Sequence, residues 1–401
     1  MSTETIVVGP QPTVKATRRQ SIDVRQYGIL AALVIIMVLF EVLTGGRLLM
    51  PGNVNNLIQQ NAYVLILAIG MVMVIIGGHI DLSVGSVVAM VGAITALAMN
   101  NWGFPWWAAV ILALLTGCLV GAWQGFWVGY MGIPAFIVTL AGMMLFRGLT
   151  LVLLYGGTIG GLPAAFVSIG AGWLPPVLGA SGKLDVLTLV LGGLAAAGLA
   201  VQLIRSRISR RKQGFPVEGP VAFWAKIVVA VVAIMALCWQ LASYSGMPVI
   251  LIILAVLILA YTFVLNRTVF GRHIYAIGGN LFSAQMSGVK TKRVNFAIFV
   301  NMGMLAALAG VISTSRAGGA VASAGQNYEL DAIAAVFIGG AAVQGGVGTV
   351  IGAVIGGLVM GVLNMGLSIL AVDAAWQQAI KGFVLLLAVA FDLINKRRGR
   401  R

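Results

Sequence analysis

A few ionisable and hydroxyl side chains lie within or beside long apolar stretches of this chain. They are Asp81 and Ser83, then Arg147, and then Glu329 and Asp331, and the amide of Asn61 lies in a similar setting. A charged side chain inside a membrane costs about 3 kcal/mol or more, so it needs a partner or a function. We therefore treat these six residues as candidates for a translocation path or gate.

Each candidate also has a structural interpretation. Asp81 can accept hydrogen bonds from the amides that open a helix. Arg147 needs an acidic or carbonyl partner, and a structural ion pair is the favoured one. Glu329 and Asp331 can cap a helix near the outer face, and Asn61 can serve a helix–helix contact.

The sequence lacks the residues that nucleotide binding, nucleophilic catalysis or metal binding would require. The chain has no Gly-x4-Gly-Lys-Ser/Thr loop to cradle phosphates, no nucleophile elbow, and only two histidines, His79 and His273. Cys118 and Cys238 lie in apolar runs and have no disulfide or metal-binding spacing. We expect neither an enzyme nor a bound metal or cofactor, so active transport would draw on an ion gradient or a separate ATPase.

Composition indicates an integral membrane protein. The 401 residues are 60% hydrophobic and 9% charged, with a mean hydropathy of +1.03, whereas a soluble domain carries about 25% charged residues. The net charge is +15. Most Lys and Arg residues fall in four stretches: 1–26, 205–226, 266–293 and 396–401. This placement fits one membrane face beside anionic lipid rather than nucleic-acid binding.

Twelve segments approach the length of about 20 apolar residues that crosses a bilayer as a helix. They are 27–44, 54–77, 82–99, 105–129, 134–155, 185–204, 223–243, 248–266, 294–315, 329–344, 348–371 and 375–395. We expect an all-α polytopic protein with 10–12 transmembrane helices over 27–395. With the N-terminus inside, as the basic stretches indicate, an even number of crossings puts both tails, 1–26 and 396–401, in the cytoplasm.

Acids mark the start of both short segments: Asp81 precedes 82–99, and Glu329 and Asp331 open 329–344. This pattern suggests broken helices and an internal duplication. Lys381, near the outer end of the last pair, is expected at the membrane interface.

The stretch Asn266–Arg293 is a polar island with five cations and no acid. Asn280 is suited to cap a short helix and Gly288 to stop it, with Phe282 and Met286 on one face. The alternatives are a solvated basic loop and a helix that docks on a partner.

Several motifs together resemble those of permease subunits of monosaccharide ABC importers, most closely the D-xylose type. They are Ile80-Asp-Leu-Ser-Val-Gly-Ser86, Pro134-Ala-Phe-Ile-Val-Thr-Leu-Ala-Gly142, Phe146-Arg-Gly148, Gly271-Arg-His-Ile-Tyr-Ala-Ile-Gly-Gly-Asn280, Ser287-Gly288 and Leu330-Asp-Ala-Ile-Ala-Ala-Val-Phe-Ile-Gly-Gly340. The ordered set covers nearly the whole chain. The extra apolar pair over 185–243, with its basic loop, also fits the xylose type.

The resemblance implies a homodimer in the bacterial inner membrane, with a cytoplasmic ABC ATPase and a periplasmic sugar-binding protein as partners. It makes 266–293 the coupling loop. The coupling residues would be Gly271, Arg272, Tyr275, Gly278, Asn280, Phe282, Ala284, Met286, Ser287 and Gly288. The chain departs from the family at Phe282-Ser283-Ala284, where Glu-Ala-Ala is usual, so the polar contacts to the ATPase differ.

The leading hypothesis is therefore a sugar permease, for D-xylose or a related monosaccharide. Within the superfamily the alternative solute is another pentose or hexose, or a branched-chain amino acid. Two further classes are an ion-coupled transporter that uses Asp81, Glu329 and Asp331, and a membrane scaffold without transport.

Overall fold

The computed structural model describes residues 24–181, 184–215 and 217–398, and most of these residues lie in helices. Most of the expected tail 1–26 and the end of the tail 396–401 lie outside this part. The helices are α1 (Val24–Leu43), α2 (Pro51–Ile76), α3 (Val84–Asn100), α4 (Trp106–Gly129), α5 (Ala135–Leu154), α6 (Ala164–Ala171), α7 (Val186–Lys212), α8 (Pro220–Ala242), α9 (Val249–Arg267), α10 (Val269–Gly279), α11 (Leu281–Met286), α12 (Thr291–Ala317), α13 (Tyr328–Ile338), α14 (Val350–Ile369) and α15 (Ala374–Arg398).

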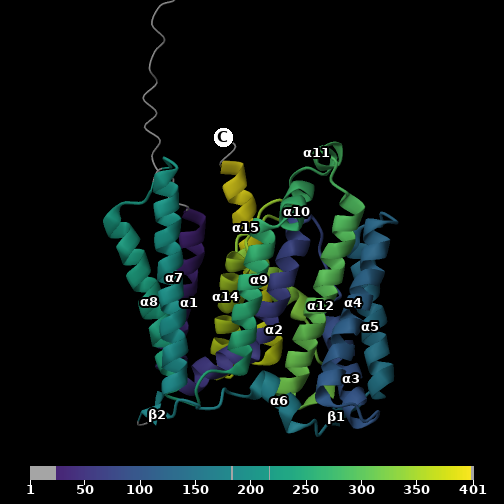
Figure 1. Cartoon of the computed structure of the whole chain (residues 1–401). Coiled ribbons are helices and arrows are strands. Elements are labelled where there is room, and N and C mark those ends of the chain that lie inside the picture. Colours follow the sequence, from purple (N-terminus) through teal and green to yellow (C-terminus); the bar gives the residue numbers. More distant parts are fainter. Residues whose placement is uncertain (1–23, 182–183, 216, 399–401) are drawn as a thin grey trace, which may run out of the picture.

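Two short antiparallel ribbons join loops at one end of the bundle (Figure 1). One pairs β1 (Thr158–Gly160) with β4 (Gly319–Val321), and the other pairs β2 (Ala180–Ser181) with β3 (Leu184–Asp185). Helix α6 lies at this same end, which we call the α6 end. Helices α10 and α11, the α7–α8 connection and the described end of α15 lie at the other, the α11 end (Figure 1).

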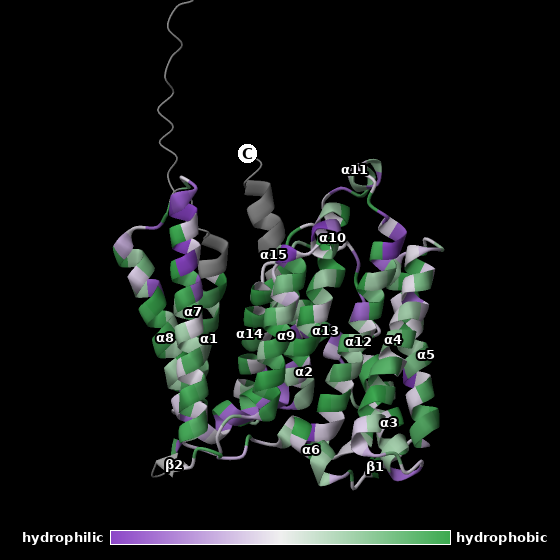
Figure 2. Ribbon diagram, in the orientation of Figure 1, coloured by the Kyte–Doolittle hydropathy of each residue, from purple (hydrophilic) through white to green (hydrophobic). Residues whose placement is uncertain are grey.

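The expected fold class is confirmed. Each of the twelve candidate segments falls on a helix, and eight helices in the described part are long and apolar enough to cross a membrane. These eight are α2, α4, α5, α7, α8, α9, α12 and α14. Two shorter apolar stretches are Gly28–Leu43 of α1 and Val84–Asn100, which is α3. Figure 2 shows hydrophobic residues along the middle of the bundle and hydrophilic ones gathered toward the α11 end.

The centre of the bundle is α2, which is buried along nearly its whole length against α12 and α14. Close packing elsewhere depends on small residues, as in many membrane helices. Helix α4 carries glycine at every fourth position, Gly117, Gly121, Gly125 and Gly129, along its contact with α12. A Cβ added at Gly121 would collide with the backbone of Phe299. The two helices therefore approach backbone to backbone.

Helices α7 and α8 form a peripheral hairpin. They pack mainly on each other, and the hairpin meets the remaining bundle chiefly where α8 contacts α2. Leu241 and Ala242, the last residues of α8, are buried. These two helices correspond to the extra pair expected over 185–243.

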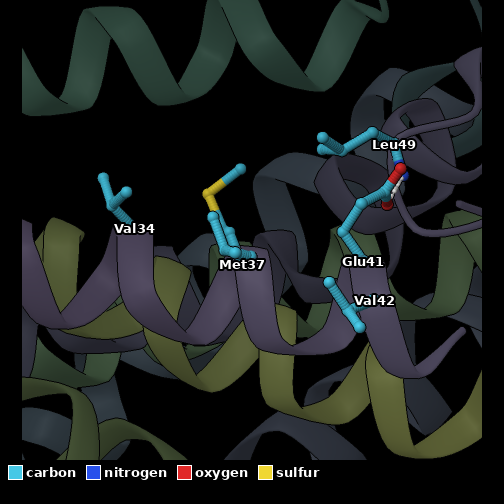
Figure 3. A pocket seen from close by; sticks show the side chains of 6 residues that line it. Val34, Met37, Glu41, Val42 and Leu49 are labelled. Carbon is cyan, nitrogen blue, oxygen red and sulfur yellow. Dashed lines mark hydrogen bonds between the residues drawn. The ribbon is translucent and has the colours of Figure 1, made fainter.

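A shallow hollow of about 210 Å³ marks the exposed face of α1. It is lined by Val34, Met37, Val38, Glu41, Val42 and Leu49. The Glu41 carboxylate is its only charged group, and it accepts a hydrogen bond from the Leu49 amide at 2.9 Å (Figure 3). The apolar lining fits contact with lipid.

Candidate functional site

Two helices of the bundle are interrupted. The chain leaves α2 at Ile76 and runs without helix through 77–83 before α3 begins at Val84. It also leaves α13 at Ile338 and runs without helix to α14 at Val350. Because α13 has 11 residues, it is about 16 Å long, half of the ~30 Å hydrocarbon core. The broken helices expected from 82–99 and 329–344 are therefore present.

The first turns of α3 and α13 meet inside the bundle. A Cβ added at Gly85 would collide with the carbonyl oxygen of Gly325 and with the Glu329 carboxylate. Gly325 itself has φ +69°, a left-handed conformation that suits glycine. Two helix N-termini, each with a partial positive charge, thus converge beside polar side chains. Such convergence of broken helices is typical of solute sites in transporters.

Asp81 and Ser83 form a buried polar group at the start of α3. Asp81 is 2% exposed, and its Oδ1 accepts hydrogen bonds from the Ser83 amide at 2.8 Å and the Ser83 hydroxyl at 2.7 Å. Gln124 of α4 donates to the Ser83 Oγ at 2.5 Å. The structural interpretation of Asp81, as acceptor for an amide at a helix start, is confirmed.

Arg147 differs from the expectation of an ion pair. In the described part of the chain its guanidinium donates to two carbonyl oxygens, those of Ala322 at 3.0 Å and Ala324 at 2.7 Å. The reason is that the segment between β4 and α13 is not helical, so its carbonyls have no partners within a helix. Arg147 therefore ties α5 to the segment that leads into α13.

Asp331 and Lys381 form an ion pair that the sequence analysis did not include. Asp331 is 2% exposed and Lys381 is part-buried. Their expected positions near the outer face stay predictions. The Lys381 Nζ lies 3.3 Å from each oxygen of the Asp331 carboxylate. The Tyr63 hydroxyl donates to Asp331 Oδ2 at 3.0 Å, and the rings of Tyr63 and Tyr328 stack with centroids 3.5 Å apart.

This cluster joins α2, α13 and α15, and we call it the Asp331 cluster: Tyr63, Tyr328, Asp331 and Lys381. Sequence analysis missed Tyr63 and Tyr328 and did not pair Lys381 with Asp331. The signal was Lys381, the single charged residue in the apolar stretch 374–391, which needs a partner by the argument applied to Arg147.

Asn61 serves a helix–helix contact. It donates to the Leu57 carbonyl at 2.9 Å and accepts from the Asn364 amide at 3.2 Å. It thereby joins α2 to α14, opposite Gly361.

At the α11 end, the polar island contains two helices where one was expected. Asn280 caps α11 by accepting a hydrogen bond from the Ser283 amide at 2.9 Å, and Gly288 follows the helix at φ +80°, both as predicted. Phe282 and Met286 are 69% and 70% exposed, whereas Ala284 is buried. Arg272, Ser287 and Gly288 are exposed as well. Helix α11, which lies at the edge of the bundle in Figure 1, thus exposes two apolar side chains.

The additional helix, α10, contacts both interruptions. A Cβ at Gly278 would collide with the Ile76 carbonyl at the end of α2, and it would lie 2.6 Å from the Gly346 amide nitrogen. The Tyr275 hydroxyl donates to the Gly348 carbonyl at 2.7 Å, and burial raises the pKa of this phenol, so it keeps its proton. Gly271 packs against Leu265 at the end of α9. Helix α10 therefore connects α11 to the chain segments beside both broken helices.

Residues 53–389 match the sequence profile of the permease component of branched-chain amino acid transport systems. The chain belongs to this permease family. It is 40% identical over 379 residues to the xylose transport system permease protein XylH of Haemophilus influenzae, covering 94% of this chain and 99% of that protein. Against XylH of Escherichia coli K12 the identity is also 40%, over 94% of both chains. The ribose import permease protein RbsC of H. influenzae is 34% identical over 85% of this chain and 84% of its own length. No solved structure gives a significant match.

The permease is a multi-pass membrane protein, and its relatives are named as transport permeases rather than enzymes. Within the described residues there is no group of three or more His, Cys, Asp or Glu side chains that could hold a metal ion. Its candidate site therefore consists of two parts: the polar contacts around α3 and α13, and the α10–α11 pair.

Proposed function

We propose that this chain is the membrane permease of an ATP-driven importer for D-xylose or a related monosaccharide. The observation that carries the proposal is the 40% identity, over 94% of the chain, to permeases named for xylose transport. In this proposal the ATPase is a separate cytoplasmic chain, a periplasmic binding protein delivers the sugar, and two copies of the permease pair in the inner membrane.

The α11 end faces the cytoplasm in this proposal. The cation-rich stretches 205–215 and 266–293 both lie at that end (Figure 1), as the positive-inside rule requires of cytoplasmic connections. Both termini would then be cytoplasmic, and the binding protein would dock at the α6 end.

Helix α11 docks on the ATPase, and α10 passes the movement on. The support is geometric: Phe282 and Met286 project from the bundle, while Gly278 and Tyr275 of the adjoining helix contact the segments 76–78 and 345–348. ATP can shift the permease between two states only through contacts that differ between them. A displacement of α11 would reach, through α10, the segments 77–83 and 339–349 that adjoin α3 and α13.

The sugar path runs where α3 and α13 converge, beside Asp81, Ser83, Arg147, Glu329 and Asp331. The half-helix α13 and the segment before it are held by few polar contacts, chiefly those of Arg147 and Asp331. Asn61 supports this region through its contact with α14.

Reconstitution tests the proposed function. Proteoliposomes that contain the complete importer are expected to take up labelled D-xylose when ATP is supplied to the ATPase side and the binding protein to the other. Unlabelled ribose, hexoses and branched-chain amino acids, added as competitors, identify the solute class. Uptake by this chain alone, driven by an ion gradient without ATPase, would refute the proposal in favour of a secondary transporter.

Replacing Phe282 by aspartate tests the docking surface. The substitution places a charge on the exposed face of α11, so we expect ATP-driven uptake to fall while the amount of protein in the membrane stays unchanged. The matched control is Phe215→Asp, which makes the same chemical change at a 59% exposed position in the α7–α8 connection, also at the α11 end. If Phe282→Asp retains uptake, α11 is not the ATPase contact.

A further inference from the structure

Helix α7 extends well beyond the length that a bilayer requires. Its 27 residues span about 40 Å, compared with a hydrocarbon core of about 30 Å. Its buried residues, Thr188, Gly192 and Ala196, all lie in the first half, and its last three residues are basic. The described end of α7 therefore extends past the apolar part of the helix at the α11 end (Figure 1), and none of its residues after Ala196 is buried.

Two cations of this region stabilise the hairpin connection. The Arg207 guanidinium lies 4.3 Å from the centroid of the Phe223 ring and donates to the Glu218 carbonyl at 3.0 Å. Lys226 lies 3.6 Å from the Glu218 carboxylate. Glu218 is thus already engaged, and it is the only acid between residues 186 and 242.

The other cations divide between two faces of α7. Arg205, Ile208, Ser209, Lys212 and Gln213 line one hollow of about 350 Å³, because residues spaced by three, four, seven and eight share a helix face. Arg210 and Arg211 lie on the opposite side and take no part in it. In the described part of the chain no acidic side chain forms an ion pair with Arg205 or Lys212.

We propose that this hollow is a binding site for the headgroup of an anionic phospholipid. Its two cations and the Ser209 hydroxyl are donors for phosphate oxygens, and Ile208 offers an apolar contact to the glycerol and acyl region. The site begins in the turn that follows the apolar part of α7, at the level where headgroups lie. Few contacts join the hairpin to the rest of the bundle, so a bound lipid would add to its attachment.

The position of the hollow favours lipid over a protein partner. In Figure 1 the end of α7 and helix α11 lie on opposite sides of the bundle, so a partner on α11 need not cover α7. The inference is independent of the transported solute and of the proposed coupling.

The test compares two double variants with the same loss of charge. Full-length chain carrying Arg205→Gln and Lys212→Gln, and chain carrying Arg210→Gln and Arg211→Gln, are purified, delipidated and exposed to vesicles of phosphatidylcholine with fluorescent phosphatidylglycerol. The first variant is expected to lose affinity for phosphatidylglycerol by at least about fivefold relative to the second. Arg205→Lys, which keeps the charge, should bind nearly as well as the unaltered chain.

Three results would overturn the proposal. Equal losses in both double variants would indicate a diffuse field of charge rather than a site. Unchanged binding in the first variant would show that the hollow takes no lipid. If that variant instead loses co-purification of the ATPase with lipid binding intact, the surface belongs to a protein partner.

Discussion

Replacing Gly278 by alanine is expected to abolish most of the ATP-driven uptake, whereas the same change at Gly279 should leave uptake near that of the unaltered chain. The added Cβ at Gly278 would collide with the Ile76 carbonyl, while a Cβ at Gly279 meets no atom within 4 Å. Overpacking of this kind costs about 1–3 kcal/mol. The backbone at this contact must move, and it is the contact that links α10 to the end of α2.

Measurements of uptake, ATPase activity and thermal stability in detergent distinguish a loss of coupling from a loss of stability. If α10 transmits the movement of α11, Gly278→Ala lowers uptake more than it lowers ATP hydrolysis by the complete importer. Equal behaviour of Gly278→Ala and Gly279→Ala would contradict this role of α10.

Lys381→Met is expected to destabilise the chain by about 3–5 kcal/mol, because it leaves the buried Asp331 carboxylate without its cation. Asp331 is 2% exposed, its Oδ1 lies 3.3 Å from Lys381, and that oxygen accepts no hydrogen bond in the described structure. The double variant Asp331→Asn, Lys381→Met should recover most of the lost stability, since it removes both charges.

The surface pair Glu218 and Lys226 provides the control. Both side chains are more than 40% exposed, so Glu218→Gln is expected to cost less than about 1 kcal/mol. Thermal unfolding of the purified chain and uptake are measured for each variant. If the double variant regains stability but not uptake, the Asp331 cluster takes part in transport as well as in packing. Loss of less than about 1 kcal/mol in Lys381→Met would mean that the buried pair does not form.

Features set by short stretches of chain could be predicted. The twelve apolar segments coincide with helices because crossing a membrane requires a local run of apolar residues. The cap at Asn280 and the stop at Gly288 depend on neighbouring backbone groups alone.

Helix α10 could not be predicted this way. Its 11 residues include Gly271, Gly278 and Gly279, and glycine disfavours a helix by about 1 kcal/mol at each position. The helix exists because Ile274 and Ile277 are buried and Gly278 fits against the end of α2. The contact between Gly278 and Ile76 joins residues about 200 positions apart in sequence, so no local pattern predicts it.

The sequence alone therefore determined the membrane character, the positions of the spans and the exposed apolar helix in the basic loop. Tertiary structure decided which charges meet: Lys381 pairs with Asp331, 50 residues away, and Arg147 binds carbonyls about 175 residues away. The cost of an unpartnered charge in a membrane requires that a partner exist. Which partner it is depends on how the helices pack, and that is a property of the whole bundle.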